Sequence, residues 1–333
     1  MTRLLPFQFV LRVVLVLLLV ALQLPRCAKA QGAAFSEDGL LFSNLSCARL
    51  HRIVERHGSG ISAMQGSGPA PRPRDIAYGS SAAQRLDVYA PDVEERNGSL
   101  APMIVMVHGG AWCVGDKGMG RVTSNKVARW VRRGIVFVSV NYRMLPDRAD
   151  PLAQAGDVAT ALAFVQSHAR DWGGNPDAIV LMGHSAGAHL VSLLDADPAL
   201  AKRYGAKPWL GTVSLDSAVM NVPELMSSSH AALYDDAFGS DRGYWAKASP
   251  QQNISTAMHP WLGVCSSLRK NSCPQAHAFA QAAQQRGVKA LVLEQALKHS
   301  AINENLGAVG PYTDAVESFI GSLSPEFAQR LPH

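Results

Sequence analysis

The chain has 333 residues, of which 47% are hydrophobic and 17% are charged. This composition excludes a disordered protein and suits one large globular domain or two small ones. The formal net charge is +5, but four of the basic residues and no acidic residue lie within positions 1–30. Without that segment the charge is +1. No basic excess remains that would indicate a nucleic-acid partner.

The first element has the pattern of a secretory signal peptide. Arg3 and Arg12 precede an apolar run at 13–22, and the sequence AKA ending at Ala30 offers small residues for cleavage. The run is shorter than the roughly 20 residues that a spanning helix needs. We therefore predict a signal peptide over residues 1–30 and a secreted or periplasmic protein without stable membrane insertion. A retained anchor is the alternative.

Cysteine spacing indicates a disulfide. Removal of residues 1–30 leaves four cysteines, an even number in an oxidising compartment. Cys265 and Cys273 enclose the short polar segment CSSLRKNSC, and we predict a bond between them. The alternative is that both are reduced and packed in the interior.

Strand patterns begin after residue 74. Residues 31–74 are expected to form an irregular arm that ends in a linker rich in Gly, Ser, Pro and Arg. Two alternating segments then read as edge strands, and continuous apolar runs follow that are typical of strands covered on both faces. The predicted strands are 75–79, 86–89, 103–107, 135–140, 178–182, 211–215, 261–264 and 290–293.

Helical patterns separate these strands. One carries the apolar stripe Val158, Ala161, Leu162 and Val165, and others are expected over 276–285 and 311–323. Alternating apolar strands and helices predict an α/β domain over 75–333, with a mostly parallel sheet between helical layers. The segment 219–255 breaks this alternation and is a candidate cap insertion over the carboxyl edge of the sheet.

The motif Gly183-His-Ser-Ala-Gly187 lies where an apolar strand ends and a helical pattern begins. A turn this sharp crowds the neighbouring backbone, so it requires glycine on both sides of the serine. Ser185 is then exposed at the apex, and the amide of Ala186 points at an oxyanion formed by attack at the serine. This context favours a nucleophile over a plain tight turn.

A second glycine motif, His108-Gly-Gly-Ala-Trp112, directly follows an apolar strand. Paired glycines allow main-chain N–H groups to approach a ligand closely. Gly109 and Gly110 are therefore the expected partners of Ala186 in an oxyanion hole, and His108 is expected to shape the loop. Alone, the motif could be a glycine turn that ends a strand.

A serine hydroxyl is a poor nucleophile at neutral pH and needs a base to take its proton. His184 and His189 belong to the serine motif and the helix after it, and His168 ends a surface helix. His299 lies in the loop KHSAINENLG, after the last predicted strand and after Ser185 in the chain. His299 is therefore the predicted base.

The acid of the triad is less clearly defined. It should lie between Ser185 and His299 at the carboxyl edge of the sheet and hold the imidazole in the correct tautomer. The loop 265–273, where such an acid usually lies, contains neither Asp nor Glu. Asp216, at the end of the preceding strand, is the first candidate, Glu294 is the second, and a triad without a working acid is the third.

Together these motifs resemble the α/β-hydrolase superfamily, with its order of serine, acid and histidine. The chain is similar to the esterase branch that includes hormone-sensitive-lipase-like carboxylesterases, feruloyl-esterase-like (BD-FAE) domains and kynurenine formamidases. The resemblance covers about residues 75–323 and is carried by HGGAW, NYR at 141–143, WGGNPD at 172–177, GHSAGAH and the His299 loop. HGGAW in place of HGGG, and His184 where Asp is usual, favour the formamidase and feruloyl-esterase side.

The resemblance implies Ser185 as nucleophile and His299 as base, with Gly109, Gly110 and Ala186 around the oxyanion. We expect a secreted serine hydrolase that cleaves small-molecule carboxylic esters through an acyl-serine intermediate. An arylformamidase-type amide hydrolase and a non-catalytic binding protein on the same scaffold are the alternatives. No metal or organic cofactor is expected, because the sequence has neither zinc-type ligand spacing nor a phosphate-binding glycine loop. Acyl preference and oligomeric state are left open.

Overall fold

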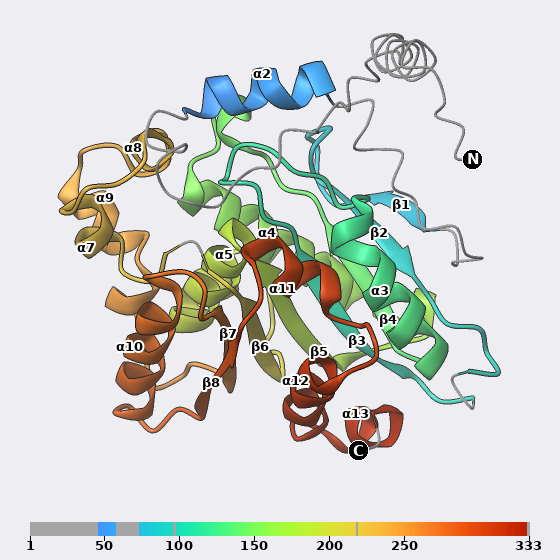
Figure 1. Cartoon of the computed structure of the whole chain (residues 1–333). Coiled ribbons are helices and arrows are strands. Elements are labelled where there is room, and N and C mark those ends of the chain that lie inside the picture. Colours follow the sequence, from blue (N-terminus) through green and yellow to red (C-terminus); the bar gives the residue numbers. More distant parts are fainter. Residues whose placement is uncertain (1–45, 58–72, 96–97, 218, 332–333) are drawn as a thin grey trace, which may run out of the picture. The chain divides into compact units, whose positions relative to one another are not determined.

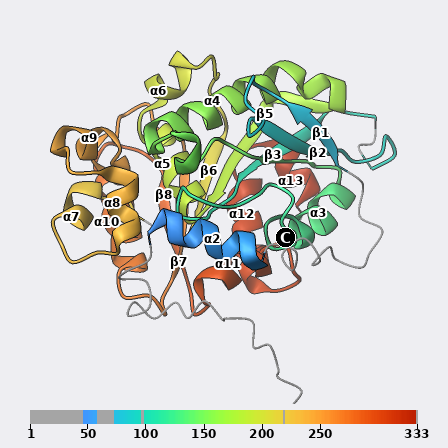
Figure 2. The same cartoon turned by 90° about the horizontal axis from the view of Figure 1, so that it is seen from above.

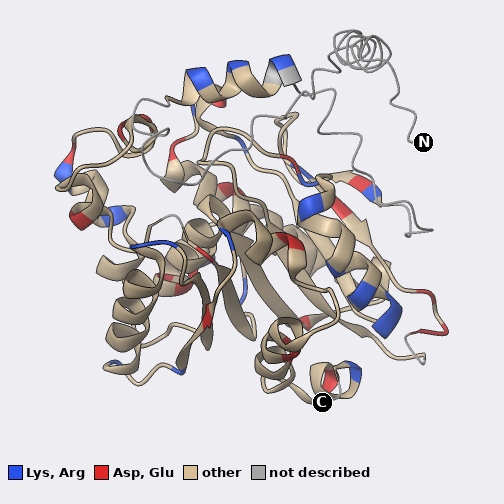
Figure 3. Cartoon of the chain, in the orientation of Figure 1, with Lys and Arg blue, Asp and Glu red and all other residues tan. Residues whose placement is uncertain are grey.

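The computed structural model describes residues 46–57, 73–95, 98–217 and 219–331 (Figure 1). The predicted signal peptide and most of the predicted arm lie outside these ranges. Within them, no helix is both long enough and apolar enough to cross a membrane. Acidic and basic residues occur on helices and loops throughout the described chain (Figure 3).

An eight-stranded sheet forms the centre, in the order β1-β2-β4-β3-β5-β6-β7-β8. The pairs β1–β2 and β2–β4 are antiparallel, and the pairs from β4 to β8 are parallel. The predicted α/β class with a mostly parallel sheet is confirmed. The strands are β1 Arg74–Ala77, β2 Arg85–Tyr89, β3 Ala101–Val107, β4 Val136–Val140, β5 Gly174–His184, β6 Gly211–Leu215, β7 Trp261–Ser266 and β8 Ala290–Gln295.

Helices cover both faces of the sheet (Figures 1 and 2). Met103 and Val105 of β3 pack in one hydrophobic cluster, and Ile104 and Met106 pack in the other. Both sets are fully buried, which explains why β3 is a continuous apolar run rather than an alternating one. On one face lie α4 Pro151–His168, α5 Ala186–Ala196, α6 Pro198–Arg203 and α10 Ser272–Gln284; on the other lie α3 Gly120–Trp130, α11 His299–Asn305, α12 Pro311–Gly321 and α13 Pro325–Arg330.

The expectation of an irregular arm over 31–74 is wrong for one segment, because helix α2 spans Cys47–His57. Leu50 of this helix is buried in a small cluster with Cys113, and Ile53 packs against the same cluster. A disulfide joins Cys47 to Cys113. The helix is amphipathic, because Leu50 and Ile53, three positions apart, share the face that packs against this cluster, and the expectation of an irregular arm overlooked this pattern.

The segment 219–255, the candidate cap, is helical rather than extended. The rings of Tyr234 and Phe238 lie 5.9 and 5.0 Å from the ring of Trp112, in the loop after β3. Asp236 accepts a hydrogen bond of 2.6 Å from the main-chain N–H of Cys47. The segment therefore lies against α2 and the HGGAW loop. Its helices are α7 Val222–Met226, α8 Ala232–Phe238, α9 Arg242–Lys247 and the 3₁₀ turn Pro250–Gln252.

Candidate active site

Ser185 occupies a strained turn between β5 and α5. Its backbone angles are φ 55° and ψ −117°, a conformation that residues other than glycine seldom adopt. A Cβ atom on Gly183 would lie 2.4 Å from the carbonyl oxygen of Gly187, and one on Gly187 would lie 2.3 Å from that of Val107. Both flanking positions therefore require glycine, and the serine stands at the apex of the turn.

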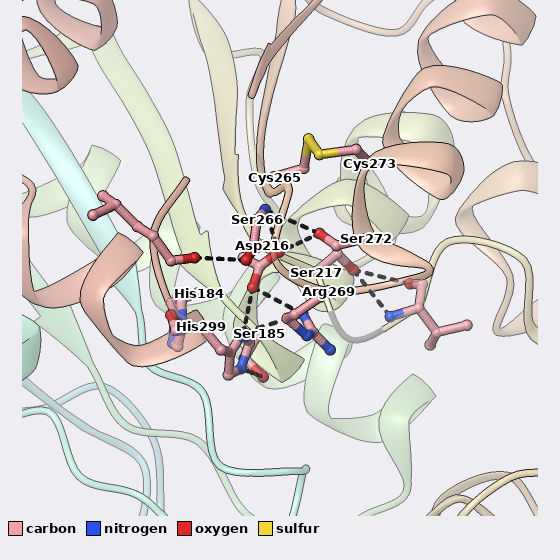
Figure 4. Close-up of polar contacts among 12 residues, drawn as sticks. His184, Ser185, Asp216, Ser217, Cys265, Ser266, Arg269, Ser272, Cys273 and His299 are labelled. Atoms are coloured by element: carbon pink, nitrogen blue, oxygen red, sulfur yellow. Dashed lines mark hydrogen bonds and ion pairs between the residues drawn. A yellow bond between two sulfur atoms is a disulfide. The ribbon is translucent and has the colours of Figure 1, made fainter. Parts of the chain in front are cut away.

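His299, the first residue of α11, lies within reach of this serine (Figure 4). Its Nε2 atom is 2.9 Å from Ser185 Oγ, and its Nδ1 atom is 2.5 Å from Asp216 Oδ2. So short a contact with a carboxylate requires a proton on Nδ1, which donates to Asp216. Nε2 is then left with a lone pair that accepts the hydroxyl hydrogen of Ser185. Three distant chain segments meet in a nucleophile, base and acid arrangement.

Asp216 follows β6 directly and is fully buried, with φ 48°. Its Oδ1 atom accepts hydrogen bonds from the main-chain N–H of Ser266, at 3.0 Å, and from the Ser272 hydroxyl. Its Oδ2 atom accepts from Arg269 Nη1 at 2.8 Å, in addition to His299. The loop 265–273, which contains neither Asp nor Glu, thus provides three hydrogen-bond donors to Asp216 at the end of the neighbouring strand.

These contacts determine the charge of Asp216. Burial by itself would raise the pKa of Asp216, because it disfavours the ionised form. The hydrogen bond from His299 and the positive charge of Arg269, assisted by Ser272, outweigh burial and hold this pKa well below its ordinary value. The carboxylate therefore stays ionised, in a form that can accept the Nδ1 hydrogen of the imidazole.

The second candidate acid lies elsewhere. Glu294 is on β8, its side chain is exposed, and it contacts His277 at 2.8 Å. Asp216, the first candidate from sequence, is the one that the fold brings to His299. Cys265 and Cys273 are joined by a disulfide at the ends of the loop that contacts Asp216.

The HGGAW loop packs against the serine turn. A Cβ atom on Gly109 would lie 2.8 Å from both Ser185 Cβ and the His184 carbonyl oxygen. Gly110 has φ 127°, and a Cβ there would lie 1.7 Å from the carbonyl oxygen of Val114. The loop main chain therefore approaches Ser185 as closely as glycine allows, while Ala186 begins α5 on the other side of the serine.

Two residues of this loop have left-handed backbone without being glycine: Ala111, with φ 55°, and Trp112, with φ 59°. The buried indole N–H of Trp112 donates to Nδ1 of His189 on α5, at 3.3 Å. The Nε2–H of His189 in turn donates to the carbonyl oxygen of Ala248 at 2.8 Å. Burial lowers the pKa of His189 to about 4, which keeps the ring neutral and able to accept. His189 therefore connects the glycine loop to the segment 219–255.

His184, inside the serine motif, has a role that its sequence position did not reveal. Its Nε2–H donates to the main-chain carbonyl of His299 at 3.0 Å, and the two rings lie 4.5 Å apart. Burial, together with the nearby His299 ring, lowers the pKa of His184 well below its ordinary value. The neutral ring is thus a fixed donor to the main chain of His299.

Other histidines of the described chain have local partners. His108 is buried, stacks on Tyr142 at 4.7 Å and lies with Nδ1 2.7 Å from the carbonyl oxygen of Gly109. His168 contacts Asp171 at the exposed end of α4. Among the residues that the structure describes, no group of three or more His, Cys, Asp or Glu side chains could hold a metal ion.

A family model places these motifs in a known group of proteins. The model for BD-FAE matches residues 86–278, more than half of the chain. The chain belongs to the BD-FAE family. The matched region includes both glycine motifs and Asp216 and ends before His299.

Curated relatives match over shorter stretches. Esterase LipQ of Mycobacterium tuberculosis is 31% identical over 201 residues, covering 56% of this chain and 47% of LipQ. A probable isoprenylcysteine alpha-carbonyl methylesterase, ICMEL1 of Oryza sativa subsp. japonica, is 36% identical over 119 residues, covering 36% of this chain and 26% of that protein. The BD-FAE chain thus spans less than two thirds of these relatives' length.

Solved structures share the fold over most of the chain. Esterase B of Lactobacillus rhamnosis superposes with a TM-score of 0.63 and 19% identity, covering 85% of this chain and 95% of that one. Esterase 2 of Thermogutta terrifontis superposes with a TM-score of 0.60 and 18% identity, covering 79% and 100%. The BD-FAE chain has the α/β-hydrolase fold.

Proposed function

We propose that this BD-FAE protein is a serine carboxylesterase that cleaves small-molecule carboxylic esters through an acyl-serine intermediate. The observation that carries the proposal is the pair of contacts on one imidazole: 2.9 Å to Ser185 Oγ and 2.5 Å to Asp216 Oδ2. The glycine loop beside the serine supports it. The names of the relatives, which include esterases and carboxylic ester hydrolases, point to the same reaction class.

In the acylation step, Ser185 Oγ forms a bond to the ester carbonyl carbon while His299 Nε2 takes the hydroxyl proton. The carbonyl electron pair moves to oxygen, where main-chain N–H groups of Gly109, Gly110 and Ala186 would stabilise the negative charge. Collapse of this intermediate breaks the bond to the alcohol oxygen. His299 returns the proton to that oxygen, so the alcohol leaves and the acyl group stays on the serine.

Deacylation repeats these steps with water. His299 takes a proton from water as its oxygen attacks the acyl carbon, and the proton then passes to Ser185 Oγ as the acid leaves. Asp216 remains ionised and accepts the Nδ1 hydrogen throughout. Its negative charge stabilises the imidazolium that forms in each half of the reaction.

We further propose that the enzyme works outside the cytoplasm. The signal-peptide pattern over 1–30 and the two disulfides both favour an oxidising compartment. In this proposal residues 75–333 form the hydrolase domain, preceded by an arm over 31–74 and interrupted by a cap at 219–255. Cleavage of the signal peptide would leave Gln31 as the first residue, so the mass of the protein recovered outside the cytoplasm of its host tests export and cleavage.

Hydrolysis of p-nitrophenyl acetate by the purified protein tests the activity. We expect turnover by the wild type and loss of at least about 10³-fold in Ser185→Ala. A fluorophosphonate probe should label the wild type and fail to label Ser185→Ala. Ser167→Ala, at an exposed serine on α4, is the matched control and should behave as the wild type.

Two results would contradict the proposal. Faster cleavage of N-formylkynurenine than of any ester, in a panel of graded acyl length that includes methyl esters, would assign an arylformamidase-type amide hydrolase. Absence of both labelling and hydrolysis would assign a binding protein on a hydrolase scaffold.

A further inference from the structure

The loop between β7 and α10 brings a cation into the candidate triad (Figure 4). Arg269 Nη1 lies 2.8 Å from Asp216 Oδ2 and 3.2 Å from His299 Nδ1. The Nδ1 hydrogen is directed at Asp216, so Nδ1 cannot also accept from arginine. Arginine and imidazole are therefore two donors that share one carboxylate oxygen.

This sharing affects the two charge states of His299 differently. A neutral imidazole beside the guanidinium needs only the one hydrogen bond to Asp216. An imidazolium would place a second positive charge next to the first, with one carboxylate to balance both. Like charges in contact disfavour the charged form of the group that can titrate, and arginine cannot lose its proton.

We propose that Arg269 is a positioning residue that holds Asp216 ionised and oriented and that its charge opposes protonation of His299, so that the ring is easier to protonate when the arginine is removed. The inference rests on the proposed function of Ser185 and His299 in ester hydrolysis. With Arg269 present, the fall of kcat/KM on the acid side of the pH profile would occur at a lower pH than without it.

The other titratable groups that pack around His299 are neutral or contact other residues. His184 of the serine turn is buried and neutral. Burial raises the pKa of Tyr312 on α12 and of Tyr234 on α8, so both remain uncharged. Lys126 of α3 is a second cation, and its Nζ donates to the carbonyl and side-chain oxygens of Asn303 rather than to the triad.

The remaining charges near these elements lie at the surface or outside direct contact. Lys298 precedes His299 and Lys270 follows Arg269, and both side chains are exposed. Glu304 acts on Lys126 through its charge. Arg269 is therefore the cation whose removal should be felt most strongly at His299.

Local structure keeps this arginine in place. The Arg269 loop is closed by the disulfide between Cys265 and Cys273. At one end of the loop Ser266 Oγ donates to the carbonyl oxygen of Leu297, two residues before His299. At the other end the Ser272 hydroxyl contacts Asp216. The loop is thus attached to the segments that carry both the acid and the base.

The pH dependence of kcat/KM, measured from pH 4 to 9, tests the inference with three variants. In Arg269→Met we expect the midpoint of the acid limb to move upward by about one pH unit, with the plateau within about tenfold of the wild type. Arg269→Lys keeps the charge and should retain most of the wild-type midpoint. Lys270→Met removes a charge from the same loop and should leave the midpoint unchanged.

Two outcomes would overturn the inference. An equal loss of rate at every pH in Arg269→Met would mean that the arginine only braces the loop. A higher KM with an unmoved acid limb would mean that it contacts substrate.

A second measurement does not depend on turnover. In Ser185→Ala and in Ser185→Ala/Arg269→Met, the titration of the His299 ring can be followed by NMR. An upward shift of its midpoint on loss of the arginine supports the inference, and an unchanged midpoint refutes it. A wild type that hydrolyses no ester would refute the proposed function, while the NMR comparison would still decide the effect of Arg269.

Discussion

His184 and His299 are joined by a hydrogen bond of 3.0 Å, from the imidazole Nε2 of the first to the main-chain carbonyl oxygen of the second. The bond connects the turn that carries the candidate nucleophile, Ser185, with the helix that carries the candidate base. His184 is next to the candidate triad and His299 is part of it, so the bond fixes the distance between two chain segments separated by 115 positions.

Removal of this donor should disturb the position of the base. We expect His184→Ala to lower kcat by about ten- to a hundredfold with little change in KM, because catalysis depends on sub-ångström placement. His184→Gln carries an amide N–H that can replace Nε2–H and should recover part of the loss. His168→Ala, at a partly exposed position at the end of α4, is the control. Equal activity of His184→Ala and the wild type would contradict the role.

Loss of the buried carboxylate should have a larger effect. We expect Asp216→Asn to lower kcat by about 10³- to 10⁴-fold, because the amide no longer selects the Nδ1–H tautomer of His299. Glu294→Gln removes the second candidate acid and should leave the rate near that of the wild type. Steady-state kinetics on one ester compares the two variants. The assignment of Asp216 fails if the effects are reversed.

The glycine loop should tolerate no side chain at Gly110. A Cβ there would lie 1.7 Å from the carbonyl oxygen of Val114, and φ is 127°, so Gly110→Ala must move the loop. We expect at least about a hundredfold loss of kcat, the scale of removing one oxyanion donor. Gly321→Ala, whose Cβ would make contacts of 3.7 Å and longer, is the matched control for assay and folding. Full activity of Gly110→Ala would exclude this loop from the oxyanion site.

Lys126 should make stability depend on pH above neutrality. Burial lowers the pKa of Lys126 to about 7, whereas in the unfolded chain it returns to about 10.4. Between these values the unfolded state binds more protons, so the free energy of unfolding should rise with pH, by at most about 1.4 kcal/mol per unit. Below pH 7 both states are protonated and this contribution becomes constant.

Urea unfolding at pH 7.5, 8.5 and 9.5 checks this slope. Lys126→Met should remove the pH dependence of the unfolding free energy. The variant also loses the contacts with Asn303, and this loss should lower the unfolding free energy equally at each pH. Lys202→Met, at an exposed lysine on α6, should keep the wild-type slope. A slope that survives in Lys126→Met belongs to another group.

The disulfide between Cys265 and Cys273 should contribute to both stability and rate. We expect the double serine variant to lose about 2.5 kcal/mol of unfolding free energy, the chain-entropy value for so short a loop. Its kcat should fall by about tenfold, because the same loop supplies the donors to Asp216. Chemical denaturation and ester hydrolysis measure the two effects. An unchanged kcat in a destabilised variant would mean that the disulfide stabilises the fold without affecting the active site.

Local patterns in the sequence were sufficient for the sheet and for the choice of Ser185 and His299 as candidates. The buried parallel strands are continuous apolar runs and the first two strands alternate, so all eight strands of the described chain were predicted close to their observed positions. The serine turn was recognised because steric crowding demands glycine at Gly183 and Gly187. His299 was recognised because it follows the last strand, and carboxyl ends of parallel strands meet at one edge.

The tertiary structure decided what depends on contacts between distant segments. Asp216 and Glu294 both precede His299 and follow Ser185, and only strand order and burial place one beside the imidazole and the other in solvent. The approach of Arg269 to the triad, and the pairing of Cys47 with Cys113 through helix α2, have no local pattern. They arise because a sheet brings together loops far apart in the chain, and side-chain chemistry alone does not specify which loops become neighbours.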